Sequence, residues 1–283
     1  MAIKQKIKRH HSTGGINMSG FRLYFRYLSL CIQSQLQYRA SFIMMSIGHF
    51  LITFIDFLGI WVLFDRFGNL KGFTFEEAAV FYGMVHIAFA ITEAWTRGFD
   101  TFPRLIRNGD FDRILTRPRN TVLQVLGHDF QIMRVGRFLQ GLIVLLWAAY
   151  KLNISWTFGK VMLLIFSIIG GNFLFSALII LQATLSIWSI QSLEIINSFT
   201  YGGVEAAQYP LSIYKSWFRK IFIFIIPLAC INYFPAMVIL EKNDPLKSPI
   251  WFQWLSPIAG IVFFLFSLWV WKFGVKHYKS TGS

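Results

Sequence analysis

Ionisable residues stand deep inside the first two long apolar stretches of this sequence. Asp56 lies in the stretch 41–64, His49 precedes it by seven residues on the same helical face, and His86 lies in the stretch 78–97. Ionisable side chains at membrane depth are costly, and they often bind substrate or carry a proton. At about 1.5 Å per residue, Asp56 and His86 would lie roughly 22 Å and 17 Å from the same end of antiparallel helices. Two interpretations stay open: a substrate or proton site, and a plain interhelical hydrogen bond.

No sequence pattern for catalysis is present. Gly159-Lys160 is followed by Val161 and lacks the earlier glycine of a phosphate-binding loop. Cys31 and Cys230 fall in apolar surroundings on different elements, and no metal-ligand spacing includes them. The sequence therefore predicts that this chain is not an enzyme, and that it holds neither a metal nor a cofactor.

A charged segment, residues 97–119, separates two of the apolar stretches. It contains six arginines and three aspartates in a chain with only 14% charged residues. Its apolar residues recur at helical spacing on both sides of Asn108-Gly109; they are Phe102, Leu105 and Ile106, then Phe111, Ile114 and Leu115. This pattern predicts two short amphipathic helices joined at Gly109.

The ends of these two short helices are also marked in the sequence. Gly109 is suited to end the first helix, Asp110 to cap the second, and Pro118 to force the chain out of it. We expect Phe111 and Leu115 to project from the rigid turn toward a soluble partner. The competing interpretation is a solvated basic loop that contacts lipid headgroups.

The elements around these residues indicate an all-α integral membrane protein. The chain of 283 residues is 55% hydrophobic, and runs of about 20 apolar residues are long enough to span a bilayer as helix. Six such runs predict six transmembrane helices, at 41–64, 78–97, 131–150, 160–186, 221–240 and 256–275. An amphipathic helix over 21–38 is expected to lie in the membrane interface. We expect residues 1–20 to form a basic disordered tail and residues 21–283 to form a single transmembrane domain.

The distribution of charge indicates orientation rather than nucleic-acid binding, although the net charge is +14. On the predicted topology, 21 of the 27 Lys and Arg residues lie on one side of the membrane. Basic loops mark the cytoplasmic side, so both termini are expected there. The mixed segment 187–220 is too polar to span, and we expect it on the same side because of Lys215, Arg219 and Lys220. Whether it re-enters the bilayer stays open.

Two motifs carry a resemblance to a known family. Gly109–Pro118 reads G-D-F-D-x-x-L-x-R-P and resembles the G-x-(L/F)-D-x-x-L-x-R-P segment of ABC-2 type permeases. Tyr209-Pro210, Ile226-Pro227 and Phe234-Pro235-Ala236 are similar to a later proline pattern of the same family. The order, spacing and six-span layout agree from about residue 20 to 278.

The resemblance implies a permease subunit of an ABC-2 type exporter in a cytoplasmic (inner) membrane. A separate ATPase subunit would hold ATP and Mg²⁺ and dock on residues 97–119, and a second permease subunit, identical or related, would complete the pathway. By position, the coupling residues would be Asp110, Phe111, Asp112, Arg113, Leu115, Arg117 and Pro118.

The substrate and the rival functions come from the residues themselves. An aromatic-rich interior and the lack of an outer domain favour a small amphipathic or lipid-like substrate. The first rival function is a proton-coupled secondary transporter that uses Asp56 and His86, with His49 as a further polar residue of the path. The second is a membrane enzyme of lipid metabolism, and the third is a plain scaffold.

Overall fold

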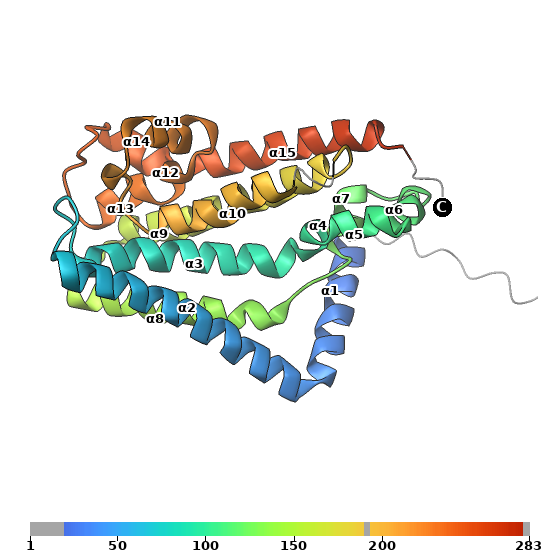
Figure 1. Ribbon diagram of the computed structural model, residues 1–283, viewed down its shortest axis with the longest axis horizontal. Coiled ribbons are helices and arrows are strands. Elements are labelled where there is room, and N and C mark those ends of the chain that lie inside the picture. The colour runs from blue at the N-terminus through green and yellow to red at the C-terminus, as the bar shows by residue number, and fades with distance from the viewer. Residues whose placement is uncertain (1–19, 190–192, 280–283) are drawn as a thin grey trace, which may run out of the picture.

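Five long helices form the body of the molecule and run side by side (Figure 1). The computed structural model describes residues 20–189 and 193–279, which are helix, turn and loop apart from one bridge between Leu70 and Phe73. Each of the five helices is long and apolar enough to cross a membrane. They are α2 (Arg39–Phe67), α3 (Phe75–Trp95), α8 (Val135–Lys151, preceded by the 3₁₀ turn Ile132–Arg134), α9 (Phe158–Leu185) and α15 (Ile258–Lys276). The all-α prediction and five of the six predicted spans are confirmed.

Short helices cover the two ends of this body. At one end, which we call the arginine end, lie α4 (Arg97–Asp100), α5 (Phe102–Arg107), α6 (Asp110–Leu115) and α7 (Thr121–Leu126). At the other, which we call the hairpin end, lie the loop 68–74 and the helices α11 to α14 (Figure 1). The capping box of Thr74 and Glu77 starts α3 there, since each side chain accepts a hydrogen bond from the other residue's backbone.

Small residues let the long helices approach closely. A Cβ atom added at Gly260 of α15 would lie 2.1 Å from the carbonyl oxygen of Gly170 in α9. One added at Gly83 of α3 would lie 2.7 Å from Cβ of Leu145 in α8. Because lipid tails are as apolar as the helix surfaces, the hydrophobic effect contributes little to helix association in a membrane. Close backbone contact is therefore a main source of stability in such bundles.

The predicted amphipathic helix forms as α1 (Gly20–Gln37), and Tyr38 separates it from α2. Figure 1 shows α1 at a steep angle to α2, beside the arginine end. Gln35 anchors it there, because its Oε1 accepts a hydrogen bond from the backbone N–H of Ile132 at 3.1 Å. The tail predicted for residues 1–20 lies outside the described residues, except for Gly20.

The segment 187–220 does not stay at the arginine end, so that prediction is wrong. Its helix α10 (Leu193–Ala207) packs along α9 and α3 and leads away from the arginine end (Figure 1). Gln208 reaches His86 inside the bundle, and the carbonyl of Ser212 accepts a hydrogen bond from Lys71 of the loop 68–74 at 3.2 Å. Helix α10 therefore crosses the body, and the residues after it lie at the hairpin end.

The predicted span 221–240 is also wrong, because this part of the chain doubles back. After the 3₁₀ turn Leu211–Ile213, α11 (Ser216–Lys220) and a π-helical turn (Ile221–Ile225) form one arm. Helices α12 (Leu228–Ile231) and α13 (Tyr233–Ile239) form the other, bent from the first by 72°. We call residues 216–239 the re-entrant hairpin.

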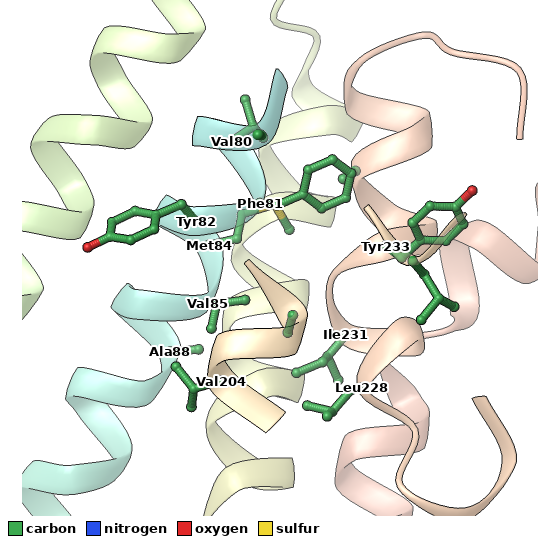
Figure 2. Close-up of a cluster of buried hydrophobic side chains, with 14 of the residues drawn as sticks. Val80, Phe81, Tyr82, Met84, Val85, Ala88, Val204, Leu228, Ile231 and Tyr233 are labelled. Atoms are coloured by element: carbon green, nitrogen blue, oxygen red, sulfur yellow. The ribbon is translucent and has the colours of Figure 1, made fainter. Parts of the chain in front are cut away.

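The tip of the re-entrant hairpin lies inside the body. The hydroxyl of Ser167, in the middle of α9, donates a hydrogen bond to the carbonyl of Ile231. Asn232 Nδ2 donates to the carbonyl of Ala207 at 2.5 Å and so ties the tip to the end of α10. Figure 2 shows Leu228 and Ile231 of the tip beside Val204 of α10. Pro227 has no N–H to continue a helix, which explains why a 20-residue apolar run breaks here.

Candidate functional site

The charged segment folds as a compact elbow of three short helices, α4 to α6, which we call the arginine elbow (residues 97–119). Gly109 makes the turn between α5 and α6 with a φ of 72°, a left-handed conformation that favours glycine. Asp110 is the first residue of α6 rather than its cap, because Gly109 occupies the capping position. The predicted capping role of Asp110 is therefore wrong, and the predicted break at Gly109 is confirmed.

The apolar side of the arginine elbow is packed against the chain's own last helix. The ring centroid of Trp271 lies 4.9 Å from those of Phe99 and Phe102 and 6.1 Å from that of Phe111. Phe111 also packs edge-on against Tyr278 at 5.0 Å, and it is fully buried. The prediction that Phe111 projects toward a partner is wrong, since this chain itself covers the periodic apolar face.

Sequence reasoning missed the role of Trp271. Trp269 and Trp271 both lie near the end of the last apolar stretch, but two residues two positions apart point to nearly opposite sides of a helix. Trp269 is 65% exposed, whereas Trp271 is fully buried under the arginine elbow. Its indole Nε1 donates to Thr121 Oγ1 of α7 at 3.2 Å. The signal that separates the two is the small residue Gly274, one turn beyond Trp271 on the same face.

The opposite side of the arginine elbow is exposed and basic. Its exposed residues include Arg104, Arg107, Arg113, Leu115, Arg117, Pro118 and Arg119. The Arg113 side chain is 80% exposed and lies 3.7 Å from Asp110. Asp112 lies beside Tyr278, and burial together with this carboxylate raises the pKa of the Tyr278 hydroxyl. Such a surface can bind an acidic partner, with Leu115 as its apolar contact.

An ionic cluster joins the arginine elbow to α3 and α8. Glu93, near the end of α3, accepts from Arg137 at 2.7 Å and lies 3.1 Å from Arg134. Arg97, at the start of the arginine elbow, pairs with Asp100 and approaches Asp129 at 3.9 Å. A buried carboxylate between two arginines fixes the relative position of its helices, because separating the pair would leave charges unpaired. Asp129 approaches Arg97 rather than Arg134 or Arg137.

The backbone of the arginine elbow also touches its neighbour directly. A Cβ atom added at Gly98 would lie 1.8 Å from the carbonyl oxygen of Val125 in α7. The arginine elbow and α7 are therefore held together by backbone contact in addition to ring packing and ion pairs. These contacts make the arginine elbow a rigid part attached to α3, α8 and α15.

The structure does not pair Asp56 with His86. His86 is buried, stacks on Tyr82 at 4.0 Å, and has its Nε2 3.2 Å from Nε2 of Gln208. The interhelical hydrogen bond predicted for His86 exists, but its partner is Gln208. Asp56 is exposed on the outward side of α2. His49 lies near the ionic cluster, with its Nδ1 3.4 Å from Arg134.

Near Phe81 and Tyr82, helix α3 lies between the re-entrant hairpin on one side and helices α2 and α8 on the other. Figure 2 shows Phe81 and Tyr82 leaving α3 on opposite sides, with Phe81 directed toward Tyr233 of the re-entrant hairpin. On its own side the Tyr82 hydroxyl donates to the carbonyl of Thr53 at 2.6 Å, and it lies 3.1 Å from Gln140 Oε1. No group of residues that could hold a metal ion occurs in the part of the chain that the structure describes.

These features define a multi-pass helical membrane protein with a rigid basic elbow at one end. Residues 50–282 match the model of a family described as ABC-2 family transporter protein, and the chain belongs to that family. No curated protein and no solved structure matches the chain. The chain is thus a membrane-embedded permease component of an ABC-2 transporter, and membership implies association with an ABC ATPase subunit.

Proposed function

We propose that this chain is the permease subunit of an exporter whose separate ATPase subunit docks on the exposed side of the arginine elbow. The observation that carries the proposal is the two-sided construction of the arginine elbow. Its apolar side is buried against Trp271, while five exposed arginines and Leu115 face outward. A partner that presses on this surface would move the helices behind it.

The internal contacts suggest how that motion is transmitted. The Glu93 pairs connect α3 to α8 behind the arginine elbow, and Trp271 connects the arginine elbow to α15. ATP and Mg²⁺ would bind to the ATPase subunit and drive its closure, and this chain would supply only the rigid lever. The arginine end would then be cytoplasmic, with both termini on that side of an inner membrane.

A second permease subunit is part of the proposal. Helix α2 leaves most of its apolar residues exposed, and Asp56 lies among them. A carboxylate that faces lipid at this depth is costly. We therefore expect this side of α2 to face a second permease, identical or related, with the pathway for a small amphipathic or lipid-like substrate between the two.

Co-purification with a co-expressed ABC ATPase tests the docking surface. Arg113→Glu/Arg117→Glu reverses two exposed charges on the arginine elbow, and Lys272→Glu/Lys276→Glu reverses two exposed charges at the same end. We expect the first variant to lose the ATPase and the second to retain it, with both chains inserted in the membrane. Equal capture by both variants, or no capture by an inserted wild-type chain, would contradict the proposal.

A proton-coupled transporter would behave differently. His86 lies within hydrogen-bond distance of Gln208 rather than of Asp56, which favours the ATP-driven function over a proton relay between the two. Transport should therefore depend on ATP hydrolysis by the partner and survive collapse of the proton gradient. Transport without any ATPase, abolished by Asp56→Asn, would favour the proton-coupled function.

A further inference from the structure

The hairpin end carries a groove with a basic mouth and an apolar interior. One wall is the outward face of the first arm of the re-entrant hairpin, and the other is α14 (Ile250–Leu255) with the loop before it. The groove has a volume of about 480 Å³. Its lining includes Arg219, Lys220, Phe224, Phe234, Trp251 and Phe252.

The order of residues along the first arm gives the groove a polarity. Ser216, Arg219 and Lys220 come first, next to the residues that contact the loop 68–74, and Ile223 and Phe224 follow one turn deeper on the same face. The arm then leads to the hairpin tip inside the body. Charges thus stand near the membrane surface and aromatic rings stand below them, which is the polarity of an amphiphile inserted from that surface.

The two cations of the groove have no acidic partner among the residues that the structure describes. Within the described residues, no carboxylate lies within 4.0 Å of Arg219 or Lys220. Asp244 is on the loop that borders the groove, but its carboxylate accepts hydrogen bonds from Tyr233, Leu246 and Ser248. A negative group from outside the chain would complete the site.

The positive-inside preference does not account for the position of these two cations. Lys and Arg are enriched at the cytoplasmic ends of membrane helices, yet Arg219 and Lys220 lie at the end opposite the arginine elbow. The apolar walls are also open: Phe224 is 79% exposed and Trp251 is 65% exposed. An acyl chain covers such rings in a bilayer, and a phosphate pairs with such cations.

We infer that this groove binds an anionic phospholipid from the leaflet at the hairpin end, with its phosphate between Arg219 and Lys220 and an acyl chain against Phe224 and Trp251. The inference goes beyond the proposed function, since it requires neither the ATPase nor transport. It can therefore fail while docking on the arginine elbow succeeds, and the reverse also holds.

Native mass spectrometry of the purified full chain tests this site. The chain in neutral detergent is supplied with equal amounts of dioleoyl phosphatidylglycerol and dioleoyl phosphatidylcholine, and the bound lipid is counted. Each basic residue near an anionic lipid favours binding enough that two together should give a preference of roughly tenfold or more. We expect Arg219→Gln/Lys220→Gln to abolish this preference. Arg66→Gln/Lys151→Gln, which removes two exposed charges from the same end, should leave it unchanged.

Two further variants separate the contributions of charge and apolar surface. Arg219→Lys/Lys220→Arg keeps both charges and should keep the preference, which guards against misfolding as the cause of a loss. Phe224→Ser should weaken binding of both lipids without changing their ratio. A wild-type chain without preference, or equal loss in the Arg66/Lys151 control, would overturn the inference. So would displacement of the lipid by millimolar inorganic phosphate, because the site would then take the free anion.

Discussion

Trp271 of α15 packs edge to face against Phe102 of α5, with ring centroids 4.9 Å apart. This contact joins the last helix of the chain to the arginine elbow, far away in sequence. It also explains why the arginine elbow carries an apolar face at helical spacing. The face is a structural surface that fixes the elbow to the bundle, and the exposed basic side is left for a partner.

Removal of the Trp271 ring should therefore detach the arginine elbow. Truncation of a buried tryptophan to alanine typically costs about 3–5 kcal/mol. We expect Trp271→Ala to lower the thermal unfolding midpoint in detergent and to reduce ATPase capture. Trp269→Ala, at a position that is 65% exposed, is the matched control and should change neither. Identical melting of the two variants would rule out a structural role for Trp271.

Glu93 should also be important for the stability of the folded chain, because it pairs with two arginines. Breaking a buried ion pair by removal of one partner costs about 3–5 kcal/mol, since the other charge stays buried. Glu93→Ala is expected to destabilise the chain, as measured by its thermal unfolding midpoint. Asp65→Ala, at an exposed position on α2, is expected to have little effect. If Glu93→Ala and Asp65→Ala melt alike, the ionic cluster does not hold α3 and α8 together.

Gly98 should not tolerate a side chain. An added Cβ would lie 1.8 Å from the backbone oxygen of Val125, and a backbone atom cannot move aside as a flexible side chain could. Gly98→Ala should displace α4 from α7, and overpacking of this kind costs about 1–3 kcal/mol. Gly202→Ala is the control, because nothing lies within 4 Å of a Cβ added there. Protease accessibility of the arginine elbow should increase in the first variant alone.

The packing of the arginine elbow against the bundle should weaken at alkaline pH because the Tyr278 hydroxyl ionises. Burial and the neighbouring Asp112 raise the pKa of this hydroxyl above its ordinary value of about 10. The neutral form is thus favoured in the folded state. The stabilisation of the folded state that comes from this neutral hydroxyl is fully present below pH about 10 and is lost as the pH rises through the raised pKa.

A titration of the thermal unfolding midpoint from neutral to alkaline pH measures this effect. The decline above pH about 10 should be smaller in Tyr278→Phe, which cannot ionise. A decline of equal size in the variant would assign the alkaline loss to other groups.

Much of the architecture could be predicted from the sequence, because some constraints act locally. Membrane helices satisfy their own backbone hydrogen bonds, so long apolar runs are sufficient to place α2, α3, α8, α9 and α15. The turn at Gly109 could also be predicted, since a position with left-handed backbone conformation between two amphipathic stretches favours glycine. A resemblance to the family could be drawn from these local patterns together with the motif at Gly109–Pro118, and the match to the family model over residues 50–282 shows the membership.

Only the tertiary structure decided which surface each pattern faces. Periodicity shows that Phe111 belongs to an apolar face, but not whether that face meets a partner or Trp271 of the same chain. Hydropathy cannot distinguish a straight span over 221–240 from a hairpin, because both bury the same apolar run. Hydropathy also could not show that Gln208 would lie beside His86, because this contact depends on the packing of α10 inside the bundle. Contacts between residues distant in sequence depend on how the helices pack, and helix packing is a property of the whole chain.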